Sequence, residues 1–215
     1  MAYLIIDIET VPRPSIDDEV EAEIIKKTKS HIDRTGDEFE SAESLIRSTS
    51  PYFGKVLCIG LRFLSDDKKQ KDKVVCENNE EDTLKIFFGI INKISKDVRF
   101  IHYNGMGFDI PFLMVRAAHH GIEINNWNFK DMRRFSFKSH IDLMMFLCNW
   151  NSYNAISLNI ACRSFDIHSP KEGEVTGSTA AKAYAEGNIP AVEEYVMREI
   201  EATYQLYNKL KQYIP

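Results

Sequence analysis

Positive charge, paired cysteines and long apolar runs are all scarce in this 215-residue sequence. Lysine and arginine together number 27 against 32 acidic residues, which gives a formal net charge of −5. That balance excludes a broad basic surface for binding a nucleic-acid duplex, although metal ions can supply positive charge locally at a small site. The content of hydrophobic residues, 44%, and of charged residues, 27%, is typical of a globular protein.

The cysteines are isolated from one another, at Cys58, Cys76, Cys148 and Cys162. None forms the CxxC pair of zinc knuckles and redox motifs, and isolated thiols suit a reducing compartment. No basic segment precedes the first apolar run, which Asp7 and Glu9 interrupt, so a secretory signal is not expected. No stretch is long enough to cross a membrane. The sequence therefore predicts a cytoplasmic protein with no membrane partner, and it leaves the oligomeric state open.

Short β-branched runs alternate with segments of helical periodicity, which predicts a single α/β domain over residues 1–215. Strands are expected at Tyr3–Ile8, Lys55–Leu64, Lys73–Glu77 and Val98–Tyr103, the first three as an antiparallel meander with a charged turn over 65–72. Helices are expected near 80–95, 108–121, 141–149, 157–165, 178–186 and 190–213, with an irregular segment over 122–139. Polar residues at about 12–52, with a helix near 18–29, are interpreted as a surface insertion.

The first group of residues with chemical potential is Asp7-Ile8-Glu9-Thr10, at the end of the first expected strand. Side chains alternate across a strand, so Asp7 and Glu9 project to one face and the neighbouring isoleucines to the other. Two carboxylates side by side on a buried strand repel each other and lose hydration, which a divalent cation or a proton relieves. The alternative is a charged strand end that faces water.

The second group is the segment NGMGFDIPFL, which begins at Asn104, follows an apolar strand and opens a helix. Its glycines allow close backbone approach. Asp109 is expected in the first helical turn, at the mouth of the sheet. The alternative is that Asn104 or Asp109 only caps the helix.

The third group is Tyr195 and Glu199 in the last expected helix, where a spacing of four places both on one face. A phenol beside a carboxylate can position a water molecule while the carboxylate binds a metal ion. The alternative is an aromatic residue on the buried face of the helix next to a solvated glutamate.

In this order, DIET, NxxxFDxPFL and a Tyr-x-x-x-acid helix resemble the DEDD exonucleases of the proofreading type. They are most similar to the exonuclease domain of family B DNA polymerases, in a stand-alone form. The resemblance implies a ribonuclease H-like (DnaQ-like exonuclease) α/β fold, a mixed sheet with flanking helices. The histidine subgroup needs a His five residues before its last acid, and none of the six histidines has one there. Tyr195 therefore indicates the tyrosine subgroup, DEDDy.

The resemblance implies two divalent cations, Mg²⁺ or Mn²⁺, and this choice agrees with oxygen-only ligands. By the same resemblance, the metal carboxylates are Asp7, Glu9, Asp109 and Glu199, with Asp7 shared between both ions. Tyr195 is implied to orient the attacking water. The implied activity is 3′–5′ hydrolysis of terminal phosphodiester bonds by a two-metal mechanism, with release of 5′-mononucleotides.

The implied partner is the 3′ end of single-stranded nucleic acid, DNA in preference to RNA, although room for a 2′-OH is what distinguishes the two. Thr10, Asn104 and Phe108 are expected to contact the terminal nucleotide, since stacking on an aromatic ring tolerates any base.

Two positions depart from the family's pattern. The last acid is usually Asp, and Glu199 is longer by about 1.5 Å. Thr176 stands where similar proteins often carry Asp. If the last helix is shifted outward, Glu199 reaches the metal; if not, it overreaches and metal binding weakens. The alternative function is therefore a catalytically weakened nuclease-fold protein that binds nucleic acid or protein. A purely structural interaction domain has no reason to carry carboxylates at these positions.

Overall fold

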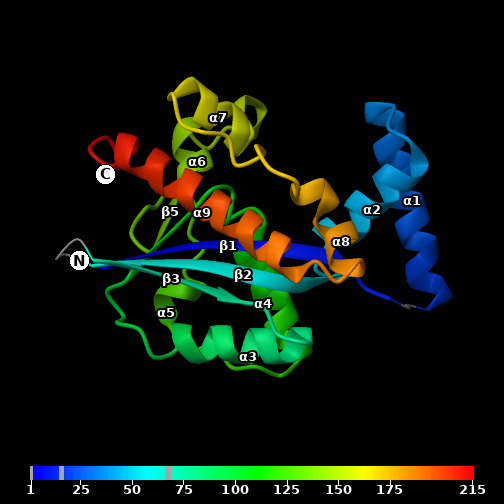
Figure 1. The fold of residues 1–215 in the computed structure, drawn as a ribbon, viewed down its shortest axis with the longest axis horizontal. Coiled ribbons are helices and arrows are strands. Elements are labelled where there is room, and N and C mark those ends of the chain that lie inside the picture. The colour runs from blue at the N-terminus through cyan, green and yellow to red at the C-terminus, as the bar shows by residue number, and fades with distance from the viewer. Residues whose placement is uncertain (1, 15–16, 66–68) are drawn as a thin grey trace.

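A computed structural model describes residues 2–14, 17–65 and 69–215 of the chain (Figure 1). Its centre is a five-stranded sheet in the order β3-β2-β1-β4-β5. Strand β1 pairs antiparallel with β2, which pairs antiparallel with β3, whereas β4 and β5 run parallel to β1. The strands are β1 Tyr3–Pro12, β2 Gly54–Leu64, β3 Gln70–Val75, β4 Arg99–His102 and β5 His140–Asp142. The predicted mixed sheet is thus confirmed.

Helices cover both faces of this sheet (Figure 1). One face carries α6 Leu143–Leu147, α7 Leu158–Ser164, α8 Gly177–Ala185 and the long helix α9 Ile189–Leu210. The other face carries α3 Glu80–Ile91, α4 Asp109–His119 and the short α5 Trp127–Lys130. The segment between β1 and β2 forms α1 Asp18–Thr35 and α2 Phe39–Thr49, which lie beside the end of β1 (Figure 1). No helix within the described residues is long and apolar enough to pass through a lipid bilayer.

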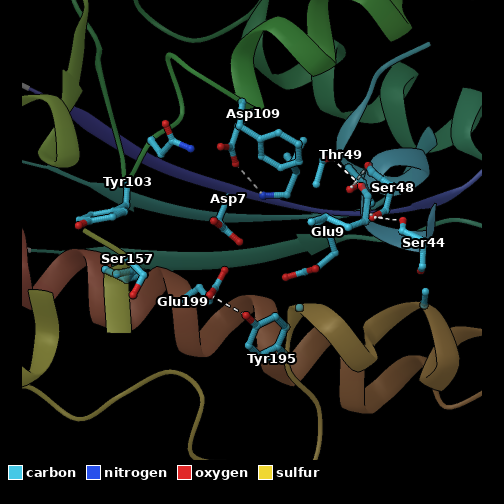
Figure 2. A pocket seen from close by; sticks show the side chains of 18 of the residues that line it. Asp7, Glu9, Ser44, Ser48, Thr49, Tyr103, Asp109, Ser157, Tyr195 and Glu199 are labelled. Atoms are coloured by element: carbon cyan, nitrogen blue, oxygen red, sulfur yellow. Dashed lines mark hydrogen bonds between the residues drawn. The ribbon is translucent and has the colours of Figure 1, made fainter. Parts of the chain in front are cut away.

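Alternation along β1 divides its side chains between two hydrophobic cores. Ile6 and Ile8 pack in the core on the α3 and α4 side. Ile5 packs in a separate core together with Ile200 of α9. The predicted alternation is therefore confirmed, and it directs Asp7 and Glu9 toward α9 (Figure 2).

Gly60 allows α9 to lie close to the sheet at this point. It pairs with Asp7 across the β1–β2 ladder. A Cβ atom at position 60 would lie only 3.0 Å from side-chain carbons of Val196 and Ile200. The missing side chain therefore lets the turn of α9 that carries Glu199 pass over the carboxylate of Asp7.

Three strands differ from the sequence-based expectation. Strand β1 continues beyond Ile8 to Pro12, because its last residues pair with the start of β2. Strand β3 begins at Gln70 rather than at Lys73, because its charged residues pair with β2 and Arg62 binds Asp72 through two hydrogen bonds of 2.7 and 2.8 Å. Positions 66–68 of the expected charged turn lie outside the described residues. The short β5 occupies the start of a segment expected to be helical. Helix α6 begins directly after it, and the side chain of Asp142 caps its N-terminus.

The insertion also contains more structure than expected. Helix α1 continues to Thr35, where Gly36 adopts a left-handed conformation and ends it. Helix α2 was not predicted at all. Arg47 of α2 forms ion pairs with Glu21 of α1 and with Glu43 one turn away, so the two helices are bound to each other.

Candidate active site

Three carboxylates from distant parts of the chain meet above the sheet (Figure 2). Asp7 and Glu9 come from β1, Glu199 comes from α9, and one oxygen of each lies within 4.8 Å of the others. Oδ2 of Asp7 is buried and has no hydrogen-bond partner among the described residues. Such an oxygen is unfavourable unless a cation or proton binds it. A cluster of oxygen donors around it fits a hard divalent cation.

The electrostatics of the cluster point in the same direction. Burial raises the pKa of Asp7 well above its usual value, and the nearby charges of Glu199 and Asp109 raise it further. Burial, then the same two carboxylates, also raise the pKa of Glu9. Burial raises the pKa of Glu199, although the hydrogen bond from Tyr195 opposes that rise. In the absence of positive charge these groups therefore retain protons that a divalent cation would displace.

Tyr195 lies one helical turn before Glu199, as its spacing predicted. Its hydroxyl donates a 2.7 Å hydrogen bond to Oε1 of Glu199. Burial, followed by the charge of Glu199, raises the pKa of Tyr195, so the phenol stays protonated and acts as a donor. The guanidinium of Arg198 lies 5.4 Å from the ring centroid of Tyr195 and also donates a hydrogen bond to the carbonyl of Val175.

Asp109 is the first residue of α4 and is buried at the same cleft. Its Oδ1 accepts a 3.1 Å hydrogen bond from the backbone N–H of Ile8, between the two carboxylates of β1. The N-cap position of α4 is Phe108, which makes no side-chain cap. The capping interpretation of Asp109 is therefore wrong, because its carboxylate binds β1 instead of its own helix. Burial raises the pKa of Asp109 to about 7.

Asp142 of β5 binds the backbone of the loop before α4. Its two carboxylate oxygens accept hydrogen bonds of 3.0 Å from the backbone N–H groups of Asn104 and Met106. Asn104 adopts a left-handed conformation, with φ 64°. Asn104 and Phe108 both line the cleft, and the ring of Phe108 packs edge-on against Phe112. Both predicted substrate-contacting residues of this loop therefore border the carboxylate cluster.

The carboxylates lie in a cleft of about 690 Å³. One wall is α2, which sequence reasoning missed, and the opposite wall contains Tyr103 and Ser157 (Figure 2). The α2 side chains that line the cleft are Glu40, Ser41, Ser44, Leu45, Ser48 and Thr49. The three serines follow the i, i+3, i+7 spacing of one helix face, a signal that was present in the sequence.

Thr10 connects this wall to β1. Its hydroxyl donates a 2.8 Å hydrogen bond to the backbone carbonyl of Ser48. Thr10 does line the cleft, as predicted, but its hydroxyl proton is engaged by α2.

The charge of the cleft lining has one sign. The acidic residues that line it are Asp7, Glu9, Glu40, Asp109 and Glu199. No lysine, arginine or histidine lines it within the described part of the chain. Among the described residues, the side chains that line the cleft therefore supply no positive charge.

The sheet order, the flanking helices and the acidic cleft define a ribonuclease H-like α/β domain. The chain belongs to a family described as predicted 3′–5′ exonucleases related to the exonuclease domain of PolB, whose model matches residues 51–214. The matched range begins after β1 and both insertion helices. Asp7 and Glu9 therefore precede it, and the fold brings them to it.

Solved structures show the same fold. The family B DNA polymerase of the hyperthermophilic archaeon Pyrobaculum calidifontis is 16% identical with a TM-score of 0.61, and the match covers 98% of this chain and 24% of the polymerase. Escherichia coli exonuclease I in complex with a dT13 oligonucleotide is 12% identical with a TM-score of 0.51, covering 98% of this chain and 41% of that enzyme. The chain thus spans less than half of either protein.

Proposed function

We propose that this protein is a metal-dependent 3′–5′ exonuclease that removes terminal nucleotides from single-stranded nucleic acid, DNA in preference to RNA. The observation that carries the proposal is the cluster of Asp7, Glu9 and Glu199 around a buried, unpartnered oxygen, in a cleft with no basic side chain among the described residues. Family membership supports the direction of attack, and the oligonucleotide bound to the exonuclease I relative supports the substrate class.

The carboxylates have distinct proposed roles, with two Mg²⁺ or Mn²⁺ ions as cofactors. Asp7 would serve both ions, Glu9 and Glu199 would complete the ligands of one, and Asp109 would serve the other. When bound, such ions neutralise charge on the phosphate and make a water molecule more nucleophilic. The hydrogen bond from the backbone N–H of Ile8 to Asp109 would keep the second metal site beside Asp7.

Tyr195 is proposed to orient the attacking water. Its hydroxyl is protonated and already lies in hydrogen-bond contact with Glu199, so it can fix the direction in which that carboxylate points. The same oxygen still has lone pairs that can accept a hydrogen bond from a water beside the cluster. This is a positioning function and requires no proton transfer by the phenol.

The terminal nucleotide is proposed to lie between Phe108 and the α2 wall. Phe108 offers a ring face for stacking, and Asn104 offers an amide for the sugar or base. The hydroxyls of Ser41 and Ser44 can donate to phosphate or sugar oxygens without adding charge. Thr10, whose hydroxyl proton is engaged by α2, is proposed to act mainly by holding that wall in place.

The decisive experiment compares a carboxylate of the cluster with a carboxylate outside the cleft. Strands labelled at the 5′ end, of DNA and of RNA, are incubated with Mn²⁺ or with EDTA. Asp7→Asn is expected to abolish hydrolysis and weaken Mn²⁺ binding in calorimetry. Asp33→Asn, the same change at an exposed aspartate of α1, is the control and is expected to retain both. Hydrolysis by Asp7→Asn at the parental rate, or in EDTA, would overturn the proposal.

The polarity of attack has its own control. A strand with a 3′-phosphate is expected to resist hydrolysis, and the products of an unmodified strand are expected to be 5′-mononucleotides. Release of internal fragments would identify a different class of nuclease.

The glutamate at position 199 favours one second candidate, a binding protein with weakened catalysis. Calorimetry separates the two, because this candidate binds strands but takes up a single Mn²⁺ ion and does not cut.

In either case we propose that residues 1–215 form one domain with a surface insertion at about 12–52. We also propose a cytoplasmic location, in keeping with four free cysteines.

A further inference from the structure

A group of basic and aromatic side chains lies outside the cleft, on the segments that precede β5 and follow α6. We call it the basic–aromatic patch: Arg133, Arg134, Phe135, Phe137, Lys138 and Trp150. Phe135 is 75% exposed, and its ring centroid lies 5.2 Å from that of Trp150. Trp150 in turn lies 5.6 Å from Phe137. The three rings form a continuous aromatic surface with its outermost member open to solvent.

The backbone holds two of these rings in an unfavourable conformation. Phe135 and Trp150 both have φ near 60°, and Asn149 has φ 49°. Bulky side chains rarely adopt the left-handed region. Conformations of this kind persist where surrounding structure enforces them, and they cluster at sites that bind ligands.

The charge of the patch is opposite to that of the cleft. Arg134 and Lys138 are exposed, and neither side chain forms an ion pair with any described residue. Arg133 is bound to Asp131 by two hydrogen bonds of 2.6 Å. Segment 130–138 holds four basic residues and one acidic residue in a chain whose net charge is −5.

The short helix α6 contacts both the patch and the cleft. Met144 of α6 lines the cleft, whereas Phe146 of the same helix lies 6.0 Å from Phe137. The chain then returns from Trp150 to the cleft at Ile156, whose carbonyl accepts a 2.7 Å hydrogen bond from the hydroxyl of Tyr103. A helix with its side chains is about 10 Å across, so a strand that ends in the cleft needs few nucleotides to reach the patch on the other side of α6.

We propose that the basic–aromatic patch binds the single strand upstream of the 3′ end that lies in the cleft. This inference rests on the proposed function for the identity of the strand. The acidic cleft repels every phosphate that is not beside a cation, so affinity for the rest of the strand has to come from elsewhere. Phe135 and Trp150 stack bases of any sequence, and Arg134 and Lys138 neutralise phosphates.

The test is binding in EDTA, which removes metal from the cleft and prevents hydrolysis. A fluorescent single strand of about 20 nucleotides is long enough to cover a stacking platform, and its anisotropy reports binding. Arg134→Glu/Phe135→Ala is expected to weaken binding at least about tenfold and to make its salt dependence shallower. The control Lys93→Glu/Tyr52→Ala makes the same charge change and removes one exposed aromatic residue elsewhere. Equal affinity of the two variants would overturn the inference.

Fluorescence supplies a second, direct readout. The chain has two tryptophans, so Trp127→Phe leaves Trp150 as the sole tryptophan, whose emission is followed by selective excitation. The strand is expected to quench this emission, and unchanged emission on saturation would overturn stacking at the patch. Arg134→Gln/Lys138→Gln, which leaves the aromatic packing intact, serves if the first variant does not fold. Patch-dependent self-association in sedimentation, with no effect of the strand, would assign the patch to a second copy and contradict the inference.

Hydrolysis distinguishes this inference from the proposed function. With Mn²⁺, the patch variant is expected to raise KM for the long strand and leave kcat, and the rate on a trinucleotide, unchanged. If the parent protein cuts no strand, and the patch variant binds the strand more weakly than the parent in EDTA, the nuclease proposal is refuted and the patch inference is supported. A parent that cuts both lengths with no effect of the patch variant would support the nuclease and refute the patch.

Discussion

Shortening Glu199 by one methylene tests whether α9 lies at the right distance from β1. Two ligands of one octahedral Mg²⁺ or Mn²⁺ ion lie at most about 4.2 Å apart, because each bond is about 2.1 Å. The oxygens of Glu199, Asp7 and Glu9 already lie within 4.8 Å, so small movements close the cluster. Glu199→Asp withdraws its oxygen by about 1.5 Å and also breaks the 2.7 Å contact with Tyr195. A displacement of about 1 Å lowers rates about a hundredfold, so a loss of at least that size is expected.

The assay measures Mn²⁺ affinity by calorimetry and single-turnover hydrolysis of a labelled strand. Glu199→Gln keeps the length and removes the charge, so both quantities are expected to fall. Glu81→Asp, at an exposed glutamate of α3 on the opposite face of the sheet, is the matched control and is expected to change neither. Equal or faster hydrolysis by Glu199→Asp would show that Glu199 overreaches. If Glu199→Gln changes nothing, Glu199 is not a metal ligand.

Three further outcomes are expected. Tyr195→Phe should slow single-turnover hydrolysis about ten- to a thousandfold with an unchanged melting temperature, and a parental rate would make this phenol a packing residue. Gly60→Ala should push α9 off the sheet and weaken Mn²⁺ binding while circular dichroism stays native; parental affinity would contradict the close approach. In EDTA, stability should fall as pH rises from about 4 through about 7, because buried carboxyls such as Asp109, with a raised pKa, bind more protons folded than unfolded. Thermal melts with and without Mn²⁺ measure this pH dependence of stability. Mn²⁺ at a hundredfold excess over its Kd should add about 2.7 kcal/mol to the free energy of unfolding. A rise of stability with pH in EDTA would refute the assignment of raised carboxyl pKa values.

Much of the candidate site could be predicted from sequence because its determinants are local. The alternation of β1 separates Asp7 and Glu9 from the isoleucines, and a spacing of four puts Tyr195 beside Glu199. These relations follow from the periods of strand and helix and need no knowledge of distant contacts. The family motifs supplied the order of elements, and the five-stranded mixed sheet agrees with it.

Short or polar elements were not predicted from the sequence because their stability comes from partners far away in the chain. Strand β5 has three residues and exists through pairing with β4. The charged start of β3 is a strand because β2 offers a ladder and Arg62 offers a counter-charge to Asp72. Helix α2 packs against α1 and β1, and its periodicity does not say which elements it will contact.

The sequence by itself identified the candidate site residues: the carboxylates of β1, the acid that opens α4 and the tyrosine–glutamate pair of α9. Only the tertiary structure decided how they are arranged. The absence of a side chain at Gly60 sets the distance from α9 to Asp7. Packing of α2 beside β1 gives the cleft a wall of hydroxyls, and the fold leaves basic side chains out of that cleft among the described residues. The physical reason is that charge and distance at a site are sums over segments that meet only when the chain is folded.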